Sequence, residues 1–337
     1  MARPKVIVTG GAGYIGSHTC VELIRSGYDP VIVDDFRNSH SSVIDGIRRI
    51  TGRTPELEEL DCTDHDRLSL FLRSFRSYDD GIFGVIHFAA YKSVRESMSE
   101  PLKYYQNNVG SLISVIRAMS DNLLRKLVFS SSCTVYGQPG SNPVTEASIG
   151  SPPTSPYGST KAICERIISD MGPALEPTVL RYFNPIGAHP SSLIGELPIG
   201  APTNLVPLIA QAASGSRGLL TVFGEDQPTE DGTCVRDYIH VMDIARAHVL
   251  ALQAKPTTVN LGLGFGTSVR QIIERFEAVN GVSVPHAYGP RQDGDVAEVW
   301  CAPDKAMADL GWEPELTVDD ALRDAWNWQK QLDGVHV

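Results

Sequence analysis

The 337-residue sequence has no cluster of basic residues and no long apolar run, and each absence excludes a class of protein. Its formal net charge is −11, so it lacks the basic surface expected of a nucleic-acid binder. No apolar run approaches the roughly 18 residues that a membrane span needs. The N-terminal residues do not form a basic region followed by a long apolar core, which argues against a signal peptide. We therefore expect a cytoplasmic protein that binds neither nucleic acid nor membrane.

Closely spaced cysteines are also absent. The sequence contains no Cys-x-x-Cys pair, and its six cysteines lie far apart, at Cys20, Cys62, Cys133, Cys164, Cys234 and Cys301. This spacing fits neither a zinc ribbon nor a dense disulfide scaffold, so we predict no metal site. Free thiols in a reducing cytoplasm are the expected state.

The first half of the chain alternates short apolar runs with amphipathic stretches of helical length. The predicted strands are Lys5–Thr9, Pro30–Asp34, Glu56–Asp61, Gly84–Phe88, Lys126–Ser131 and Thr178–Tyr182. The predicted helices lie near Ile15–Ser26, Ser41–Thr51, Asp64–Phe75, Pro101–Asn122 and Ser159–Leu175. This alternation predicts an α/β fold of the Rossmann type, a doubly wound parallel sheet with helices on both faces. Ligands of such sheets bind beyond the carboxyl ends of the strands.

The pattern changes after Tyr182. Residues Asn184–Pro207 are rich in Pro, Gly, Ser and Asn and are expected to form an ordered loop. Leu219–Phe223 and Thr258–Leu261 look like isolated strands, and the predicted helices lie near Leu205–Ser214, Val241–Gln253, Ser268–Val279, Asp304–Leu310 and Val318–Lys330. We predict a Rossmann domain over residues 1–185, to which 241–264 returns, and a smaller mixed α/β substrate lobe over 186–337.

A glycine-rich turn links the first predicted strand to the first predicted helix. Gly10, Gly13 and Gly16 allow a tight turn, close approach to a pyrophosphate and close contact between helix and sheet. The N–H groups at the start of the helix favour the negative charge of a phosphate. Asp34 ends the next strand, where its carboxylate can accept hydrogen bonds from ribose hydroxyls and would repel a 2′-phosphate. The sequence therefore favours NAD over NADP.

A second motif places a tyrosine and a lysine on one face of a helix. Tyr157 and Lys161 lie four residues apart, and Ser132 ends a predicted strand of the same sheet. A free tyrosine, with a pKa near 10, is a poor base at neutral pH. We expect the nearby ammonium to lower the pKa of Tyr157 and make it usable for acid–base catalysis.

Together these motifs resemble those of the extended short-chain dehydrogenase/reductase family, within which the sequence is similar to the UDP-glucose 4-epimerases. The further segments that carry this resemblance are 87–92 (HFAAYK), 107–109 (NNV), 182–185 (YFNP) and 235–241 (VRDYIHV). The similarity covers essentially the whole chain.

The resemblance implies a mechanism. Tyr157 would take the proton of the sugar 4-hydroxyl while carbon 4 gives its hydride to NAD. The 4-keto sugar would turn over in the site, and the hydride would return to its opposite face. Lys161 would also hold the nicotinamide ribose, and Ser132 would guide the 4-hydroxyl. Relatives pair their long helices into a four-helix bundle, which implies a homodimer by analogy.

Matching residue by residue extends the predicted site. The cofactor residues implied are Gly10, Gly13, Tyr14, Ile15, Gly16, Asp34, Asp35, Asn38, Ser39, Asp61, Cys62, Phe88, Ala89, Ala90, Lys92, Asn107, Ser132, Tyr157, Lys161 and Phe183. Those implied for the UDP-sugar are Lys92, Ser132, Tyr157, Asn184, Asn204, Leu205, Thr221, Phe223, Arg236, Tyr238, Arg291, Asp295 and Val299. A guanidinium at Arg236 suits a diphosphate on physical grounds as well.

Two departures from the family pattern bear on the substrate. Gln292 replaces an arginine expected near the diphosphate, so either Arg291 substitutes for it or the affinity for UDP drops. Val299 stands where some relatives carry a tyrosine that crowds the 2-substituent of the sugar. A small residue there leaves room for an N-acetyl group, and a plain packing role for Val299 explains it equally well.

Three rival functions share parts of the pattern. A nucleotide-sugar 4,6-dehydratase usually carries Asp-Glu where this sequence has Cys133 and Thr134, which cannot replace that acid–base pair. A UDP-pentose or UDP-uronate 4-epimerase would share every catalytic residue. A non-catalytic NAD-sensing protein typically lacks the tyrosine or the lysine, and both are present here.

Overall fold

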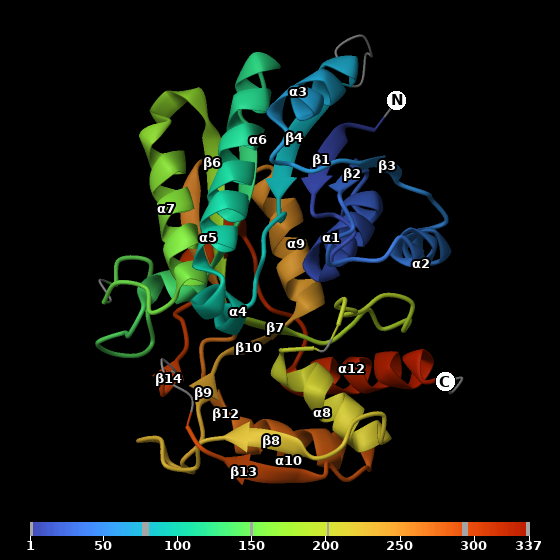
Figure 1. The fold of residues 1–337 in the computed structure, drawn as a ribbon. Coiled ribbons are helices and arrows are strands. Elements are labelled where there is room, and N and C mark those ends of the chain that lie inside the picture. Colours follow the sequence, from blue (N-terminus) through green and yellow to red (C-terminus); the bar gives the residue numbers. More distant parts are fainter. Residues whose placement is uncertain (1–2, 76–80, 149–150, 201, 292–295, 335–337) are drawn as a thin grey trace.

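A parallel sheet of seven strands forms the centre of the molecule in the computed structural model, which describes residues 3–75, 81–148, 151–200, 202–291 and 296–334 (Figure 1). The strand order is β11-β6-β5-β4-β1-β2-β3, and each neighbouring pair is parallel. The strands are β1 (Lys5–Thr9), β2 (Asp29–Asp34), β3 (Glu56–Glu59), β4 (Ile82–His87), β5 (Lys126–Ser132), β6 (Glu176–Tyr182) and β11 (Thr257–Leu261). This is the predicted Rossmann-type fold.

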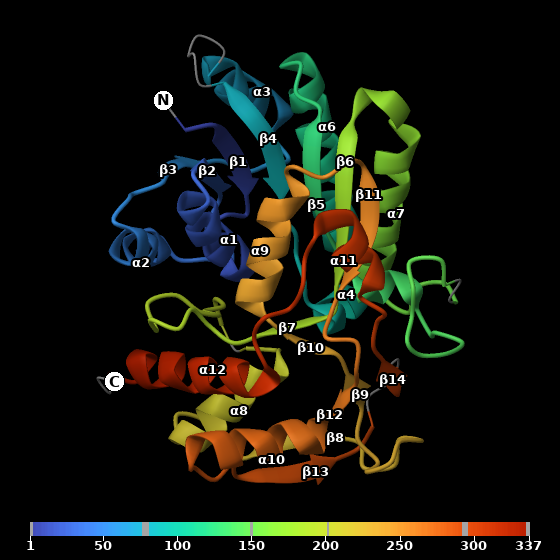
Figure 2. The ribbon, with the colours of Figure 1, turned by 180° about the vertical axis from the view of Figure 1, so that it is seen from behind.

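Helices cover both faces of the sheet because successive side chains of each strand point to opposite faces. Val6 and Val8 of β1 pack in one cluster with residues of α1 (Tyr14–Arg25) and α9 (Val241–Ala251), and α2 (Ser42–Thr51) lies beside α1. Ile7 packs in a second cluster with residues of α3 (His65–Ser74), α6 (Gly110–Asp121) and α7 (Pro156–Asp170). Figures 1 and 2 show these layers from opposite sides.

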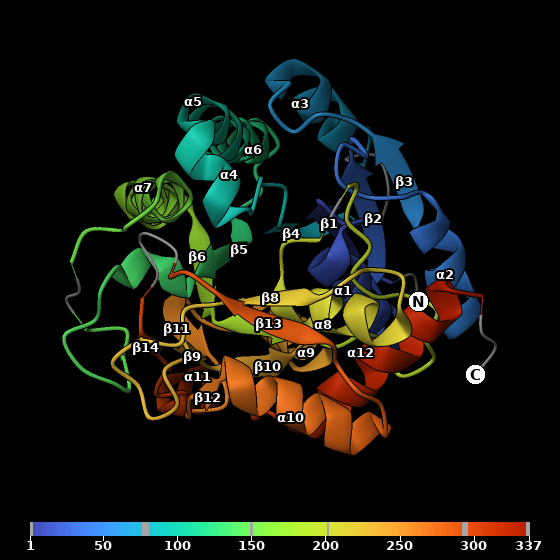
Figure 3. The same ribbon diagram turned by 60° about the horizontal axis from the view of Figure 1, so that its bottom comes forward.

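Most of the remaining elements gather at the carboxyl ends of the strands (Figure 3), whereas α11 packs against β11 and α9. The helices are α8 (Leu205–Ser214), α10 (Val269–Asn280), α11 (Asp304–Leu310) and α12 (Val318–Leu332). The strands are β7 (Asn184–Ile186), β8 (Leu220–Phe223), β9 (Val235–Arg236), β10 (Tyr238–His240), β12 (Thr267–Ser268), β13 (His286–Gly289) and β14 (Glu298–Val299). Helix α12 packs against α8 and α10 over a separate apolar cluster. Among the described residues, no helix is long and apolar enough to cross a membrane.

The structure corrects several predicted elements. Thr258–Leu261 is not an isolated strand, because β11 pairs with β6 in the central sheet, and Leu219–Phe223 is not isolated either, because β8 pairs with β13. The segment expected to be a loop contains β7, which pairs with β10. The boundary proposed at residue 185 between the two lobes stays a prediction.

The long helix predicted over Pro101–Asn122 is divided. It consists of α5 (Pro101–Tyr104), one π-helical stretch η2 (Tyr105–Val109) and α6, and the short helix α4 (Val94–Ser99) precedes it. Two 3₁₀ turns, η3 (Cys133–Tyr136) and η4 (Gly172–Ala174), follow β5 and α7. Three of the five residues of η2 are polar, but no residue type specifies a π-helical stretch, which is a local change in backbone hydrogen bonding.

Candidate active site

The glycine turn lies at the carboxyl end of β1. Gly10 has a φ of 70°, a backbone conformation that residues with a side chain rarely adopt. A Cβ atom on Gly16 would lie 2.3 Å from the carbonyl oxygen of Gly10, so helix α1 can approach the turn this closely only with glycine. Gly13 is the N-cap of α1 and no side chain caps that end. The turn therefore offers backbone N–H groups to an anion.

Asp34 at the end of β2 is buried against this turn. Its Oδ2 accepts a hydrogen bond from Ala12 N at 3.0 Å, and its Oδ1 accepts from Ser39 Oγ at 2.7 Å and from Phe36 N at 3.0 Å. Burial raises the pKa of Asp34, and these hydrogen bonds oppose that shift. The carboxylate is thus held in one orientation at the edge of the sheet where β2 ends.

Ser132, Tyr157 and Lys161 meet beyond the carboxyl end of β5. Helix α7 begins earlier than predicted, at Pro156, because Ser155 Oγ accepts a hydrogen bond from Gly158 N at 3.1 Å and caps the helix. Tyr157 consequently lies in the first turn. Lys161 is buried one turn later, where Nζ donates to the carbonyl oxygen of Ser130 at 2.6 Å.

The electrostatics of this group differ from the sequence-based expectation. Burial raises the pKa of Tyr157 to about 12, partly opposed by a hydrogen bond with Ser132. Burial also lowers the pKa of Lys161 to about 8. The predicted lowering of the tyrosine pKa by the ammonium is therefore wrong for the chain alone. The physical reasons are the loss of water around the phenolate and the distance of Lys161 Nζ, which lies 6.0 Å from the centre of the Tyr157 ring.

A cavity of about 680 Å³ joins the glycine turn to Ser132, Tyr157 and Lys161. All twenty residues predicted to contact the cofactor line it, from Gly10 on one side to Phe183 on the other. Asn184 and Asn204, both predicted for the UDP-sugar, also line it. The contacts of these residues with ligands stay predictions.

The other residues predicted to bind the UDP-sugar do not line this cavity. Those described are Leu205, Thr221, Phe223, Arg236, Tyr238, Arg291 and Val299. Arg236 Nη1 donates to Val235 O at 2.9 Å, and Arg291 Nη2 lies 2.9 Å from Asp226 Oδ2. Val299 is 6% exposed and packs in a small cluster with Phe183. Gln292 and Asp295 lie outside the described residues.

Sequence reasoning missed several charged residues that line the cavity, among them Glu196 and Arg37. The Glu196 carboxylate accepts from Lys92 Nζ at 2.5 Å and from Asn204 Nδ2 at 2.7 Å. The Arg37 guanidinium forms an ion pair with Asp35, in which Nε lies 3.1 Å from Oδ2. Both belong to irregular segments, where neither apolar periodicity nor a motif marks a residue.

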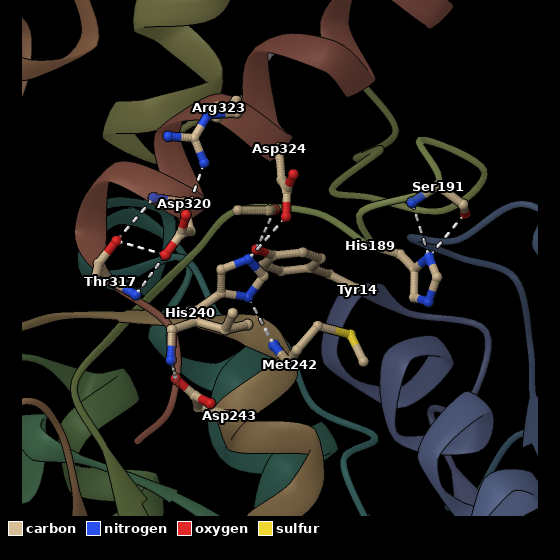
Figure 4. A network of polar contacts seen from close by, with 12 residues as sticks. Tyr14, His189, Ser191, His240, Met242, Asp243, Thr317, Asp320, Arg323 and Asp324 are labelled. Carbon is tan, nitrogen blue, oxygen red and sulfur yellow. Dashed lines mark hydrogen bonds and ion pairs between the residues drawn. The ribbon is translucent and has the colours of Figure 1, made fainter. Parts of the chain in front are cut away.

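Tyr14, beside the glycine turn, is fixed by segments that follow β6 (Figure 4). Its hydroxyl donates to the carbonyl oxygen of Gly187 at 2.6 Å. Nearby, His240 Nδ1 accepts from Met242 N at 3.1 Å, so its proton is on Nε2, which lies 3.2 Å from Asp324 Oδ2. The first contact ties α1 to the segment after β7, and the other two tie the start of α9 to α12.

The residues present fit a dinucleotide such as the one the family pattern implies. The glycine turn lets the backbone approach a pyrophosphate, and Asp34 is placed for ribose hydroxyls. Asn184 Oδ1 is buried without a hydrogen-bond partner and belongs to a residue of the cavity wall, so a polar ligand can satisfy it. Among the described residues, no group of three or more His, Cys, Asp or Glu is placed to hold a metal ion.

Known proteins match this chain over nearly its full length. Residues 6–262 match the model of the NAD dependent epimerase/dehydratase family. The chain is 46% identical over 334 residues to a UDP-glucose 4-epimerase of Yersinia pestis, with 97% of each chain covered. The solved UDP-glucose 4-epimerase of Stenotrophomonas maltophila, with bound NAD and formylated UDP-arabinopyranose, is 46% identical with a TM-score of 0.93, over 98% of this chain and 99% of that one. The UDP-Glc/GlcNAc 4-epimerase of Campylobacter jejuni is 32% identical with a TM-score of 0.81, over 97% and 99%. The chain therefore belongs to the NAD dependent epimerase/dehydratase family.

Proposed function

We propose that this chain is a UDP-glucose 4-epimerase that interconverts UDP-galactose and UDP-glucose by inverting carbon 4 of the sugar. The observation that carries the proposal is the meeting of Ser132, Tyr157 and Lys161 in one cavity with the glycine turn. Full-length similarity to proteins named UDP-glucose 4-epimerase supports the substrate.

Tyr157 and Lys161 handle the proton in this reaction. NAD⁺, when bound, supplies a hydride acceptor and a positive charge. The buried Tyr157 phenolate accepts the proton of the sugar 4-hydroxyl and returns it after the sugar has turned over. Ser132, hydrogen-bonded to Tyr157, orients the same hydroxyl. Because the pKa of Lys161 is about 8, its side chain is mostly an ammonium at neutral pH. In the chain alone this ammonium does not lower the pKa of Tyr157, so we propose that it stabilises the phenolate only once cofactor and substrate are bound. The proton and the hydride both return, so there is no net oxidation.

One experiment tests the reaction and its nearest alternatives. The purified protein is incubated with UDP-galactose, UDP-xylose or UDP-glucuronate, and the products are separated by chromatography. We expect UDP-galactose to reach equilibrium with UDP-glucose without any added reductant. Turnover of the pentose or the uronate alone would replace the proposal by a pentose or uronate 4-epimerase. Tightly held NAD without turnover of any sugar would indicate a sensing protein instead.

We also propose that the enzyme accepts UDP-N-acetylglucosamine and UDP-N-acetylgalactosamine. The support is the small side chain of Val299, which packs against Phe183, a residue of the cavity wall. Val299→Tyr would place a larger side chain there, and we expect it to reduce turnover of the acetylated sugars more than that of UDP-galactose. Undetectable turnover of the acetylated sugars by the wild type would contradict this proposal.

The assembly we propose is a homodimer that works in the cytoplasm. Large apolar side chains are exposed on four adjacent elements, with Met98 on α4, Leu102 on α5, Ile113 on α6 and Ile163 on α7 (Figure 1). A second copy of the chain would cover this face, which we call the α4–α7 face. The widely spaced cysteines support a reducing compartment.

A further inference from the structure

A largely buried carboxylate–guanidinium pair lies next to the catalytic group and takes no part in the proton transfer described above. Glu165 lies on α7, one helical turn after Lys161, and Arg181 lies on β6. Arg181 Nε is 2.9 Å from Glu165 Oε1, and Nη2 is 2.5 Å from Oε2. The two side chains are only 14% and 16% exposed. A two-point contact shielded from water fixes the orientation of both side chains.

The same pair is connected to β5 and to η3. Ser131, which precedes Ser132, donates its hydroxyl to Glu165 and stands opposite Arg181 in the register of β5 and β6. Arg181 Nη1 donates to the hydroxyl of Tyr136 at 3.0 Å. One carboxylate therefore ties the helix of the catalytic tyrosine and lysine to the strand that ends in the catalytic serine.

Glu165 also places negative charge near the ammonium of Lys161. Burial lowers the pKa of Lys161, while Cys164 and Glu165 on the same helix raise it. On the sheet side, Lys161 Nζ lies 4.9 Å from the centre of the Phe129 ring. His87 of β4 also interacts with Lys161, but burial lowers the pKa of that imidazole to about 3, so it is uncharged at neutral pH. Glu165 is thus a carboxylate on α7 that favours the charged form of Lys161.

We propose that Glu165 is a positioning residue of the epimerase reaction, which holds Tyr157 and Lys161 in register with Ser132. This inference rests on the proposed function, because it assigns Glu165 a part in the same proton transfer. Without the carboxylate, Arg181 would be largely buried and unpaired, and its positive charge would disfavour the neighbouring ammonium.

The test compares Glu165→Gln with the wild-type holoenzyme over a range of pH, with epimerisation of UDP-galactose followed by chromatography. Protonated Lys161 is the active form, so activity is lost as the pH rises through its pKa. In Glu165→Gln that pKa falls further, so the alkaline limb of the kcat profile moves to lower pH by roughly one unit. Misplacement of the helix lowers kcat at pH 7 by roughly tenfold to a hundredfold. A Glu165→Asp variant keeps the negative charge, so the alkaline limb of its kcat profile should lie at the wild-type pH.

Matched variants separate positioning from stability. Asp170→Asn removes an exposed carboxylate from the same helix, where it pairs with Arg166, and should leave both the limb and kcat unchanged. Arg181→Lys keeps both charges but breaks the two-point contact, so kcat falls while the limb stays in place. If Glu165→Gln does not fold, Arg181→Lys tests the inference in its place.

Two results would overturn the inference. One is a Glu165→Gln enzyme that melts at a lower temperature but keeps the wild-type pH profile and kcat. The other is an Arg181→Lys enzyme with wild-type kcat. A titration of Lys161 in lysine-labelled protein by NMR reads its pKa without turnover. A wild type that turns over no UDP-sugar while this pKa still falls in Glu165→Gln would contradict the proposed function and leave the charge effect of Glu165 standing.

Discussion

At the scale of single residues, the proposed reaction depends most on the hydroxyl of Tyr157. Tyr157→Phe removes the proton acceptor but keeps the ring, so the fold should remain intact. We expect kcat for UDP-galactose to fall by roughly 10²- to 10⁴-fold, the usual contribution of a positioned acid–base group. Initial rates at pH 7 measure this, and circular dichroism checks the fold. Tyr105→Phe, which removes a hydroxyl from a half-exposed tyrosine of η2, should keep wild-type kcat. Similar losses in both variants would contradict the assignment.

Sequence motifs identified three residues that the fold brings together in one cavity, and to which we assign catalysis, but they did not describe the chemistry around them. Ser132, Tyr157 and Lys161 line one cavity because the motif specifies both residue types and their spacing. The direction of the Tyr157 pKa shift could not be predicted, because it depends on how completely the fold removes water from the ring. Glu196 was missed for a related reason. Its carboxylate contacts Lys92, which lies 104 residues earlier in the sequence, and Asn204, which lies 8 residues later.

At the scale of elements, the close contact between α1 and the glycine turn predicts that Gly16 cannot be replaced without loss of stability. In Gly16→Ala the added Cβ would lie 2.3 Å from Gly10 O, and backbone atoms must shift to relieve the clash. We expect a loss of about 1–3 kcal/mol in the free energy of unfolding and weaker retention of NAD. Denaturant titration measures the first and the NAD content of the purified protein the second.

Gly110→Ala is the matched control for this clash. Gly110 begins α6 with helical backbone angles, and a Cβ there would meet nothing within 4 Å. Alanine should therefore stabilise the protein by about 0.4–1 kcal/mol. Equal effects of the two substitutions would show that the glycine turn is not constrained as described.

The strands of the sheet could be predicted well because their apolar runs are bounded by polar residues, and β1 spans the predicted Lys5–Thr9. The π-helical stretch after Tyr104 could not, because it is a local change in backbone hydrogen bonding that no residue type in η2 specifies. The start of α7 was placed too late because the cap depends on the conformation of Ser155, which the sequence does not specify.

At the scale of the whole molecule, the α4–α7 face predicts dimerisation. Leu102 on α5 is 79% exposed, and a carboxylate at this position would lie in the proposed interface. We expect Leu102→Asp to halve the molecular mass measured by light scattering during size-exclusion chromatography. Leu123→Asp is the control, because Leu123 is 84% exposed but follows α6 outside this face. A wild-type protein that elutes as a monomer would contradict the proposed assembly.

Buried histidines predict how the stability of the whole chain depends on pH. Burial lowers the pKa of His18 and His87 to about 3 and that of His189 and His248 to about 4. In the unfolded chain a histidine titrates near 6.5, so below that pH the unfolded state binds protons that the folded state does not. The stability contribution of each neutral imidazole is complete above pH 6.5 and is lost as the pH falls toward 4, at about 1.4 kcal/mol per unit.

The melting temperature should therefore fall steeply between pH 6.5 and 5, as measured by calorimetry at constant ionic strength. Buried carboxyl groups such as Asp34, whose pKa is raised, act in the opposite direction, so the comparison needs a variant that changes one histidine alone. His248→Gln keeps a donor for the carbonyl oxygen of Ile244, to which His248 Nδ1 donates at 2.8 Å, but removes one titrating group. The loss of stability per pH unit should then be smaller than in the wild type by about 1.4 kcal/mol. An unchanged slope in this variant would mean that His248 is not neutral in the folded chain.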